Sequence, residues 1–431
     1  MMRGKRLAAM LCSAALMLGA APVMPAAQAA EIRETYTLVQ RSPAEMRSFY
    51  RAHPWNFTDA SAYSVQPSVQ SPYAIGRLSD ATQQNALNCM NFIRYAAGLP
   101  ADLRINATFS EQAQAASLVN TLNNSQSHYP THPAGLSDAL YQLGYEGASH
   151  SNLCSSTAPL PNLPYTMMIY MSDTDSSNLS ALGHRRWMLN PSMQQTGFGH
   201  ISRYSAVYSV DMTRSGTFNG DYIAWPPPNM PYQLYDGYDY YRTGYAFSVT
   251  LGPSYDPPKL DAISVNLRSA KTGKTYHFDR SVQNMSGLYF NVDTQYIGID
   301  NCIIFNPAVM FAQDDVLTVD ISGTTKNGAA SPISYQVRFF DLEGSSDGSL
   351  LTGDPDNSGS VTLDDALLTL QAYTATLLNR THGLTAAQFA VADLDADKSV
   401  TLDDALIILQ YYRDHSLLNK QTSWKQLGAK I

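Results

Sequence analysis

Two short stretches near the end of the chain carry oxygen-bearing side chains at alternate positions, and each closes with a further aspartate. Counted from the first aspartate of each stretch, these side chains fall at positions one, three, five and twelve: Asp354, Asp356, Ser358 and Asp365, then Asp393, Asp395, Asp397 and Asp404. Hard oxygen ligands at alternate positions allow a tight loop to wrap around one calcium ion. The spacing therefore predicts two calcium-binding loops.

The remaining positions complete the ligand set of an EF-hand calcium loop. Position seven, Ser360 and Ser399, would supply a backbone carbonyl, and position nine, Thr362 and Thr401, would act through water. Position six is normally glycine, but the second loop has Lys398, whose backbone must then adopt a left-handed conformation at a cost of about 1 kcal/mol. We expect both loops to bind calcium, the second more weakly.

The two loops belong to an internal repeat. The segments "DPDNSGSVTLDDALLTLQAY" and "DLDADKSVTLDDALIILQYY" begin 39 residues apart, at Asp354 and Asp393. A repeat that duplicates a ligand pattern together with the helix that follows it indicates one structural unit used twice. The helical spacing predicts an inward apolar stripe in each copy, formed by Ala366, Leu367 and Leu370, and by Ala405, Leu406 and Leu409.

Two details of the repeat distinguish it from sensor EF-hands. Position twelve is aspartate rather than glutamate, and the segment before the first loop, "EGSSDGSLLTG", reads as a linker, so the helix before each loop is short or missing. Residues 346–418 resemble the type I dockerin, a duplicated module of cellulosome proteins that binds cohesin domains on a scaffold. The resemblance implies two calcium ions and a cohesin partner, and it leaves residues 419–431 as a tail.

The resemblance also implies which side chains contact cohesin. They lie at loop positions ten, eleven and eighteen: Leu363, Asp364 and Gln371, then Leu402, Asp403 and Gln410. Because the residues are identical in the two copies, such a surface could dock in either of two orientations. For Leu370 and Leu409, at position seventeen, the alternative is packing inside the module.

Four motifs earlier in the chain occur in the order "FIRYAAGL", "SHYPTHPAG", "GHRRWMLNP" and "TGFGH". On these motifs, residues 76–228 resemble the CAP (SCP-like) superfamily, in its extracellular bacterial branch. The resemblance implies an α-β-α sandwich with a cleft that holds two histidines and two acidic residues. His128 and His184 match the two histidines, whereas Ser151 stands where the family has one of its carboxylates.

The cleft histidines leave several interpretations open. They could hold a divalent metal ion or serve a hydrolase, for example a peptidase, but both uses need a carboxylate partner, and Glu146, Asp173 and Asp175 are equally eligible by sequence. Alternatively the histidines are structural hydrogen-bonding residues, and the cleft binds a lipid, a peptide or another small ligand. We expect Arg185 and Arg186 to bond backbone groups or carboxylates rather than a ligand.

Residues 229–345 have a different pattern. Runs such as "YAFSVTL", "AISVNLR" and "VLTVDISG" alternate in the manner of strands, which predicts an Ig-like β-sandwich. A tyrosine-rich segment, residues 232–245, precedes them. It could form a platform for stacking against carbohydrate, or it could pack between domains.

The first part of the chain and its overall charge bear on location and partners. Residues 1–30 have the basic start, apolar stretch and small residues of a secretory signal peptide, and residues 31–75 look like an extended lead segment. The formal net charge of -8 argues against a nucleic-acid partner, and no later stretch approaches the roughly 18 apolar residues that cross a bilayer. Cys89 and Cys154 are candidates for one disulfide bond.

These patterns predict a multidomain α+β protein with a CAP unit, an Ig-like unit and a small helical dockerin. The expected function is that of a secreted, cellulosome-associated protein that binds a scaffold cohesin through its calcium-dependent dockerin. Its CAP unit is expected to be non-catalytic and to bind a ligand that the sequence does not assign, such as a carbohydrate or another small molecule. Association with the cellulosome would link the protein to polysaccharide degradation. An extracellular hydrolase that uses the cleft histidines is the alternative.

Overall fold

The computed structural model describes residues 35–173, 175, 177–236, 244–282, 287–342, 350–358, 361–418, 420 and 422–430. The predicted signal peptide, the metal-ligand candidate Ser360 and part of the tyrosine-rich segment lie outside these residues. Helices and strands are mixed along the described chain, which agrees with the α+β prediction at that coarse level. None of the described helices is both long and apolar enough to cross a membrane.

The N-terminal half places helices on both faces of a four-stranded sheet with the order β4-β6-β7-β5. Its elements are β1 Thr35–Tyr36, α1 Pro43–Ala52, β2 Tyr63–Val65, β3 Arg77–Leu78, α2 Asp80–Ala96, β4 Arg104–Ile105, α3 Ala107–Asn123, α4 Asp138–Ser149, β5 Ser151–Ser155, α5 Leu163–Ser172, α6 Gly183–Met188, β6 Gln195–Ile201, β7 Tyr204–Tyr208 and β8 Thr217–Phe218. On one face, Leu153 and Ala206 pack against alanines of α3 and α4. On the other face, Phe198 and Val207 join a large core with α2 and α5.

The glycines of the "TGFGH" motif explain why α3 lies so close to this sheet. A Cβ atom on Gly199 would lie 2.1 Å from the Ala113 carbonyl oxygen, and one on Gly197 would lie 2.3 Å from the backbone of Phe109. Only glycine permits this approach of helix backbone to strand backbone. The motif therefore has a packing role.

The predicted extended lead segment contains a helix. Ser42 and Glu45 form a capping box at the start of α1, with Pro43 at its first position. The ring of Phe49 stacks on Tyr95 of α2 with centroids 4.2 Å apart. The extended prediction for residues 31–75 was therefore wrong over Pro43–Ala52, because the capping box and Pro43 start a helix there.

Two facing sheets follow, with the orders β10-β19-β16-β12-β13 and β14-β15-β11-β9. Their elements are β9 Tyr222–Trp225, β10 Asn229–Pro231, α7 Tyr232–Asp236, β11 Phe247–Leu251, β12 Ser264–Ser269, β13 Thr275–Phe278, β14 Tyr289–Asp293, β15 Cys302–Asn306, β16 Val316–Ser322, β17 Thr325–Lys326, β18 Ala329–Ala330 and β19 Ile333–Phe340. Rings of Phe278 and Phe305, one from each sheet, lie 5.5 Å apart. Strand β9 pairs with β11, so the sheets begin upstream of the boundary predicted at residue 228.

The tyrosine-rich segment packs inward where the structure describes it. Tyr235 and Tyr245 are buried, with ring centroids 5.2 Å apart. Tyr235 also lies against Phe339 of β19 at 4.6 Å. These tyrosines fill the core, which corrects the carbohydrate-platform alternative for them.

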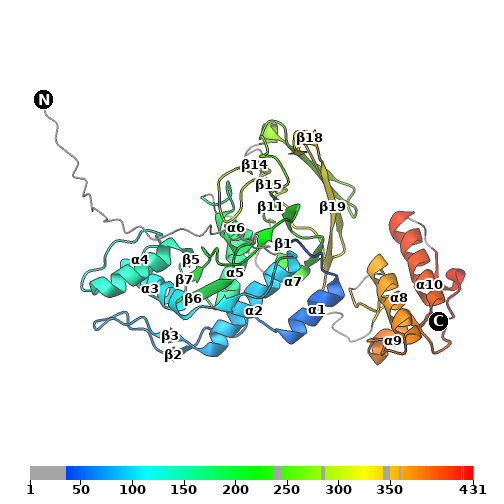
Figure 1. The fold of residues 1–431 in the computed structure, drawn as a ribbon, viewed down its shortest axis with the longest axis horizontal. Helices are drawn as coiled ribbons and strands as arrows, with labels where there is room; N and C mark the ends of the chain where they lie inside the picture. The colour runs from blue at the N-terminus through cyan, green and yellow to red at the C-terminus, as the bar shows by residue number, and fades with distance from the viewer. Residues whose placement is uncertain are drawn as a thin grey trace, which may run out of the picture.

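The last part contains α8 Leu363–Leu377, α9 Ala386–Ala392 and α10 Leu402–Tyr412, which Figure 1 shows as a group beside α1 and β19. The predicted tail belongs to this group, because Trp424 stacks on Tyr411 at 3.8 Å and Ala429 is buried in the core of the group. We call residues 350–358 and 361–430, as far as they are described, the C-terminal module. It extends beyond the boundary predicted at residue 418.

The helices of the C-terminal module bury a different face from the one predicted. Of the expected inward stripe, only the alanines are buried. In α8 the buried side chains are Asp365, Ala366, Thr369 and Ala372. The leucines at positions 363, 367 and 370 are spaced four and three residues apart, so they share one helical face, and that face points to solvent.

Candidate functional site

The first predicted calcium loop brings three of its expected ligands together. Asp354, Asp356 and Asp365 each offer a carboxylate oxygen, and these atoms lie within 4.8 Å of one another. All three side chains are almost completely buried. Ser358 adds its hydroxyl 3.4 Å from an Asp354 oxygen. The loop thus surrounds one small volume with hard oxygen atoms, as calcium requires.

The electrostatics of the first loop favour a bound cation. Burial, together with the nearby carboxylates of Asp356 and Asp354, holds the pKa of Asp365 well above its usual range. Oδ2 of Asp356 is buried and makes no hydrogen bond. Buried carboxylates without a counter-charge are unfavourable. These residues fit a calcium ion, which would supply the missing charge when bound.

Asp365 has a second task at the start of α8. Its Oδ2 accepts hydrogen bonds from the Thr362 backbone nitrogen at 2.7 Å and from the Thr362 hydroxyl at 3.0 Å. Asp404 holds Thr401 in the same way at the start of α10, at 2.9 and 3.0 Å. Position twelve therefore couples each loop to the first turn of its helix.

The second loop is more open than the first. Asp393, Asp395 and Asp397 offer oxygens within 4.8 Å of one another, and Asp397 is exposed. Asp404 is fully buried and accepts a bond from the Leu394 backbone nitrogen at 2.7 Å. The backbone nitrogen of Ser399, at position seven, donates to Asp397 at 2.8 Å.

The backbone of the second loop carries the strain that its sequence predicts. Lys398 has φ 71°, and Ala396, two residues earlier, has φ 58°. Both residues carry a Cβ atom, and for such a residue the left-handed backbone conformation costs roughly 1 to 2 kcal/mol.

Lys398→Gly is therefore expected to raise the calcium affinity of the second loop about fivefold, since about 1 kcal/mol of strain is removed. Calorimetric calcium titration of the full chain measures the change. Lys398→Ala is the matched control, because it removes the lysine charge and keeps the strained backbone. An equal gain in both variants would contradict the backbone explanation.

The exposed leucines form equivalent faces on the two repeats. Their exposed fractions agree pair by pair: 45% for both Leu363 and Leu402, 44% and 42% for Leu367 and Leu406, and 37% and 38% for Leu370 and Leu409. Gln371, Gln410 and Asp403 are exposed beside them, whereas Asp364 is partly buried. The alternative of intramodule packing for Leu370 and Leu409 is therefore wrong.

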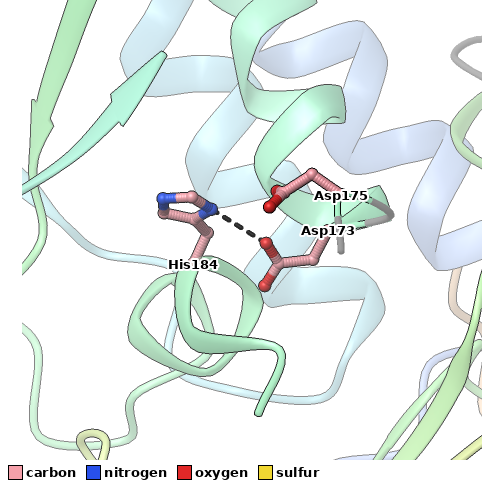
Figure 2. A group of neighbouring side chains, drawn as sticks. All are labelled: Asp173, Asp175 and His184. Carbon is pink, nitrogen blue, oxygen red and sulfur yellow. Dashed lines mark hydrogen bonds and ion pairs between the residues drawn. The ribbon is translucent and has the colours of Figure 1, made fainter. Parts of the chain in front are cut away.

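The second candidate site lies around His184 of α6. Its Nδ1 lies 2.8 Å from Oδ1 of Asp173, which caps the C-terminus of α5 with φ 51°. Asp175 places a carboxylate oxygen within 4.8 Å of the same group, and Figure 2 shows both carboxylates turned toward the imidazole ring. Because Asp173 engages Nδ1, Nε2 is the ring atom that can accept a proton or a metal ion.

The charges of this cluster act on one another. Burial alone would raise the pKa of Asp175, but hydrogen bonds from Asn178 and Ser177, together with the charge of His184, outweigh it and lower the pKa. Burial lowers the pKa of His128, and the charge of His184 lowers it further, against the opposing bond to the Ala148 carbonyl. His128 Nδ1 donates to that carbonyl at 2.9 Å. The two predicted histidines thus lie close enough to interact.

Ser151 and Asn152 of β5 lie on opposite faces of the sheet. Asn152, the next residue of β5, donates from Nδ2 to the His184 carbonyl oxygen at 2.9 Å. Successive strand residues face opposite sides of a sheet, so Ser151 lies on the face away from His184. Of the three eligible carboxylates, Asp173 is the one that contacts His184, and Asp175 lies in the same cluster.

The arginines of the "GHRRW" motif anchor α6 to the rest of the protein, as predicted. Arg185 donates to the carbonyl oxygens of Met171 at 2.6 Å and Ala246 at 2.7 Å. Arg186 forms a buried ion pair with Asp293 of β14 at 3.0 Å. The helix that carries His184 is therefore fixed to both α5 and the facing sheets.

The candidate disulfide is absent. Cys89 and Cys154 are buried free thiols in the same core, and burial raises the pKa of Cys154 to about 12. Such thiols are inert structural residues.

No protein-family model matches this chain, and no curated protein matches it either.

Proposed function

We propose that this protein is a secreted adaptor whose C-terminal module is a type I dockerin that binds a scaffold cohesin in a calcium-dependent manner. The observation that carries the proposal is the duplication. Two loops gather three carboxylates each within 4.8 Å, and each loop leads into a helix with leucines exposed at equivalent positions. An exposed apolar face on a small module indicates a surface for another protein.

Calcium connects the two halves of this proposal. Each ion would draw the carboxylates of one loop together and fix the first turn of α8 or α10, since Asp365 and Asp404 belong to both loop and helix cap. The leucine faces on these helices would then have a defined geometry for a partner. Without the ions, the faces would lose their framework.

The remainder of the chain is the cargo in this proposal. Residues 76–228 would be a CAP-like unit, supported by helices on both faces of its sheet and by the neighbouring histidines. Residues 229–345 would be an Ig-like unit, supported by the two facing sheets. Presentation on a scaffold would place a carbohydrate or small-ligand site of the CAP-like cleft near polysaccharide-degrading partners.

A calorimetric panel of cohesins tests the proposal. The full chain is expected to bind at least one type I cohesin in calcium, with affinity reduced at least a hundredfold in chelator. Leu363→Asp combined with Leu402→Asp is expected to weaken binding at least about thirtyfold in calcium, because a charge then stands on each face that could contact the partner. Binding that is indifferent to calcium, or absent for every cohesin, would contradict the proposal.

An extracellular hydrolase is the second candidate, and the 2.8 Å contact between His184 and Asp173 favours it. A histidine oriented by a buried carboxylate can act as general base, and with Asp175 it can hold a divalent metal ion. His184→Ala separates the candidates. A hydrolase loses turnover in this variant and keeps cohesin binding, whereas an adaptor without enzymatic activity has no turnover to lose.

A further inference from the structure

One arginine of α1 reaches the first calcium loop. Arg47 has an exposed fraction of 1%. Its Nε and Nη2 donate to the Asp341 carbonyl oxygen at 3.0 and 2.6 Å, and its Nη1 donates to the Asp356 carbonyl oxygen inside the loop. The guanidinium also lies over the Phe340 ring, 5.2 Å from its centroid. The Asp341 oxygen follows β19 of the facing sheets, and the Asp356 oxygen belongs to the C-terminal module. Arg47 thus bridges the junction between these two parts through backbone oxygens.

The body of the protein holds this arginine in place. Helix α1 is capped by Ser42 and Glu45, and Phe49 stacks on α2. A second arginine supports the same junction, since Arg338 of β19 donates to the Tyr412 hydroxyl of α10 at 3.0 Å and lies 5.5 Å from its ring centroid. One contact reaches the first loop and the other reaches the C-terminal end of α10, so together they define one orientation of the module.

Charge balance distinguishes the two repeats. The first loop has three clustered carboxylates, so a bound calcium ion would leave one negative charge. Arg47 interacts electrostatically with Asp356 and Asp354 and supplies the matching positive charge. The second loop has an additional aspartate at position five, Asp397, which is exposed. Arg47 therefore ties the first loop to the body, whereas the second repeat meets the body through Tyr412 at the end of α10.

The junction also restricts the partner face of the first repeat. Leu363 and Asp364 line a cavity of about 420 Å³ whose other wall includes Tyr222, Asn229 and Arg338 of the body. Asp403, the counterpart of Asp364, is exposed. A globular partner that covers Leu363 would therefore meet the body at this cavity. Leu402, the equivalent leucine of the second repeat, does not line the cavity.

We infer that Arg47 docks the first repeat onto the body, so that the second repeat is the face that a protein partner engages. The inference rests on the proposed calcium and cohesin binding. It adds that cohesin can reach the face of the second repeat more easily than the equivalent face of the first repeat. The internal repeat supplies a matched pair of variants for the test. Leu402→Asp and Leu363→Asp make the same change at equivalent positions.

Cohesin affinity of the full chain in calcium is the first readout. Leu402→Asp is expected to weaken binding about thirtyfold, as for a buried apolar anchor. Leu363→Asp is expected to weaken binding by about threefold or less. In an Arg47→Gln background the two losses should become similar. Equal losses in the unsubstituted background would overturn the inference while leaving the adaptor function intact, whereas an unsubstituted chain that binds no cohesin would refute the function itself.

A second readout needs no partner. Spin labels at Glu111→Cys of α3 and Leu377→Cys of α8, both exposed, report the distance between body and module. A single narrow distance distribution is expected in calcium, broadened by Arg47→Gln and unchanged by Arg51→Gln, an exposed arginine one turn further along α1. Calcium titration of each variant verifies that both loops still load. A distribution that stays narrow in Arg47→Gln, or is already broad without it, overturns the inference.

Discussion

Calcium removal is expected to unfold the C-terminal module while the rest of the chain stays folded. The first loop buries three carboxylates whose mutual repulsion a bound calcium ion would relieve. The core of the module that includes Leu394, Ile407 and Ile408 is small, and small domains need a further source of stability. At a calcium concentration of about 1,000 times Kd, each ion contributes about 4 kcal/mol, so the loss of two ions exceeds what such a core can offset.

Hydrogen exchange on the full chain measures this effect. Amides of α8 and α10 should lose protection in chelator, and those of α2 and α3 should keep it. Asp365→Ala combined with Asp404→Ala should reproduce the loss in the presence of calcium. Asp314→Ala is the control, since Asp314 is an exposed aspartate paired with Lys271. Unchanged protection of α8 in chelator would refute a structural role for calcium.

The grouping of carboxylates in the two loops could be predicted because the information for it is local. Ligands within twelve residues of one another are positioned by a short loop whatever the rest of the fold does. The left-handed backbone of Lys398 follows from the same local pattern. The predicted exposure of Leu363 and Leu402 is confirmed, but the outward direction of Leu367 and Leu406 was not predicted, because an apolar stripe normally faces a core. The buried face of α8 includes Ala366, Thr369 and Ala372 instead, and that of α10 includes Ala405, Ile407 and Ile408.

The cluster around His184 could be predicted only in part because the information for it is not local. Asp173 and His184 are separated by a turn whose path depends on how α5 and α6 pack. The contact between Arg47 and Asp356 spans 309 residues, so no sequence pattern could reveal it. The helix that carries Arg47 could have been found, since its Ser-Pro-Ala-Glu start is a recognised capping signal.

Arg186→Ala is expected to destabilise the main body by about 3 to 5 kcal/mol, the cost of leaving one partner of a buried ion pair without the other. Arg186 and Asp293 are both buried, and Nη1 of Arg186 lies 3.0 Å from the carboxylate. The same guanidinium donates to the carbonyl oxygens of Ala181 at 3.2 Å and Ile299 at 2.8 Å. Alanine would leave a buried charge and these carbonyls without their donor.

The loss of this anchor should also disturb the position of His184, because Arg186 lies two residues from His184 on the short helix α6. Chemical denaturation measures the main transition, with Arg280→Ala as the matched control. Arg280 also pairs with an aspartate, Asp261, but both side chains are about two-thirds exposed, and such pairs contribute at most about 1 kcal/mol. Arg186→Met with Asp293→Leu should recover much of the loss, since neither charge then remains buried. Equal effects of Arg186→Ala and Arg280→Ala would show that the buried pair does not anchor α6.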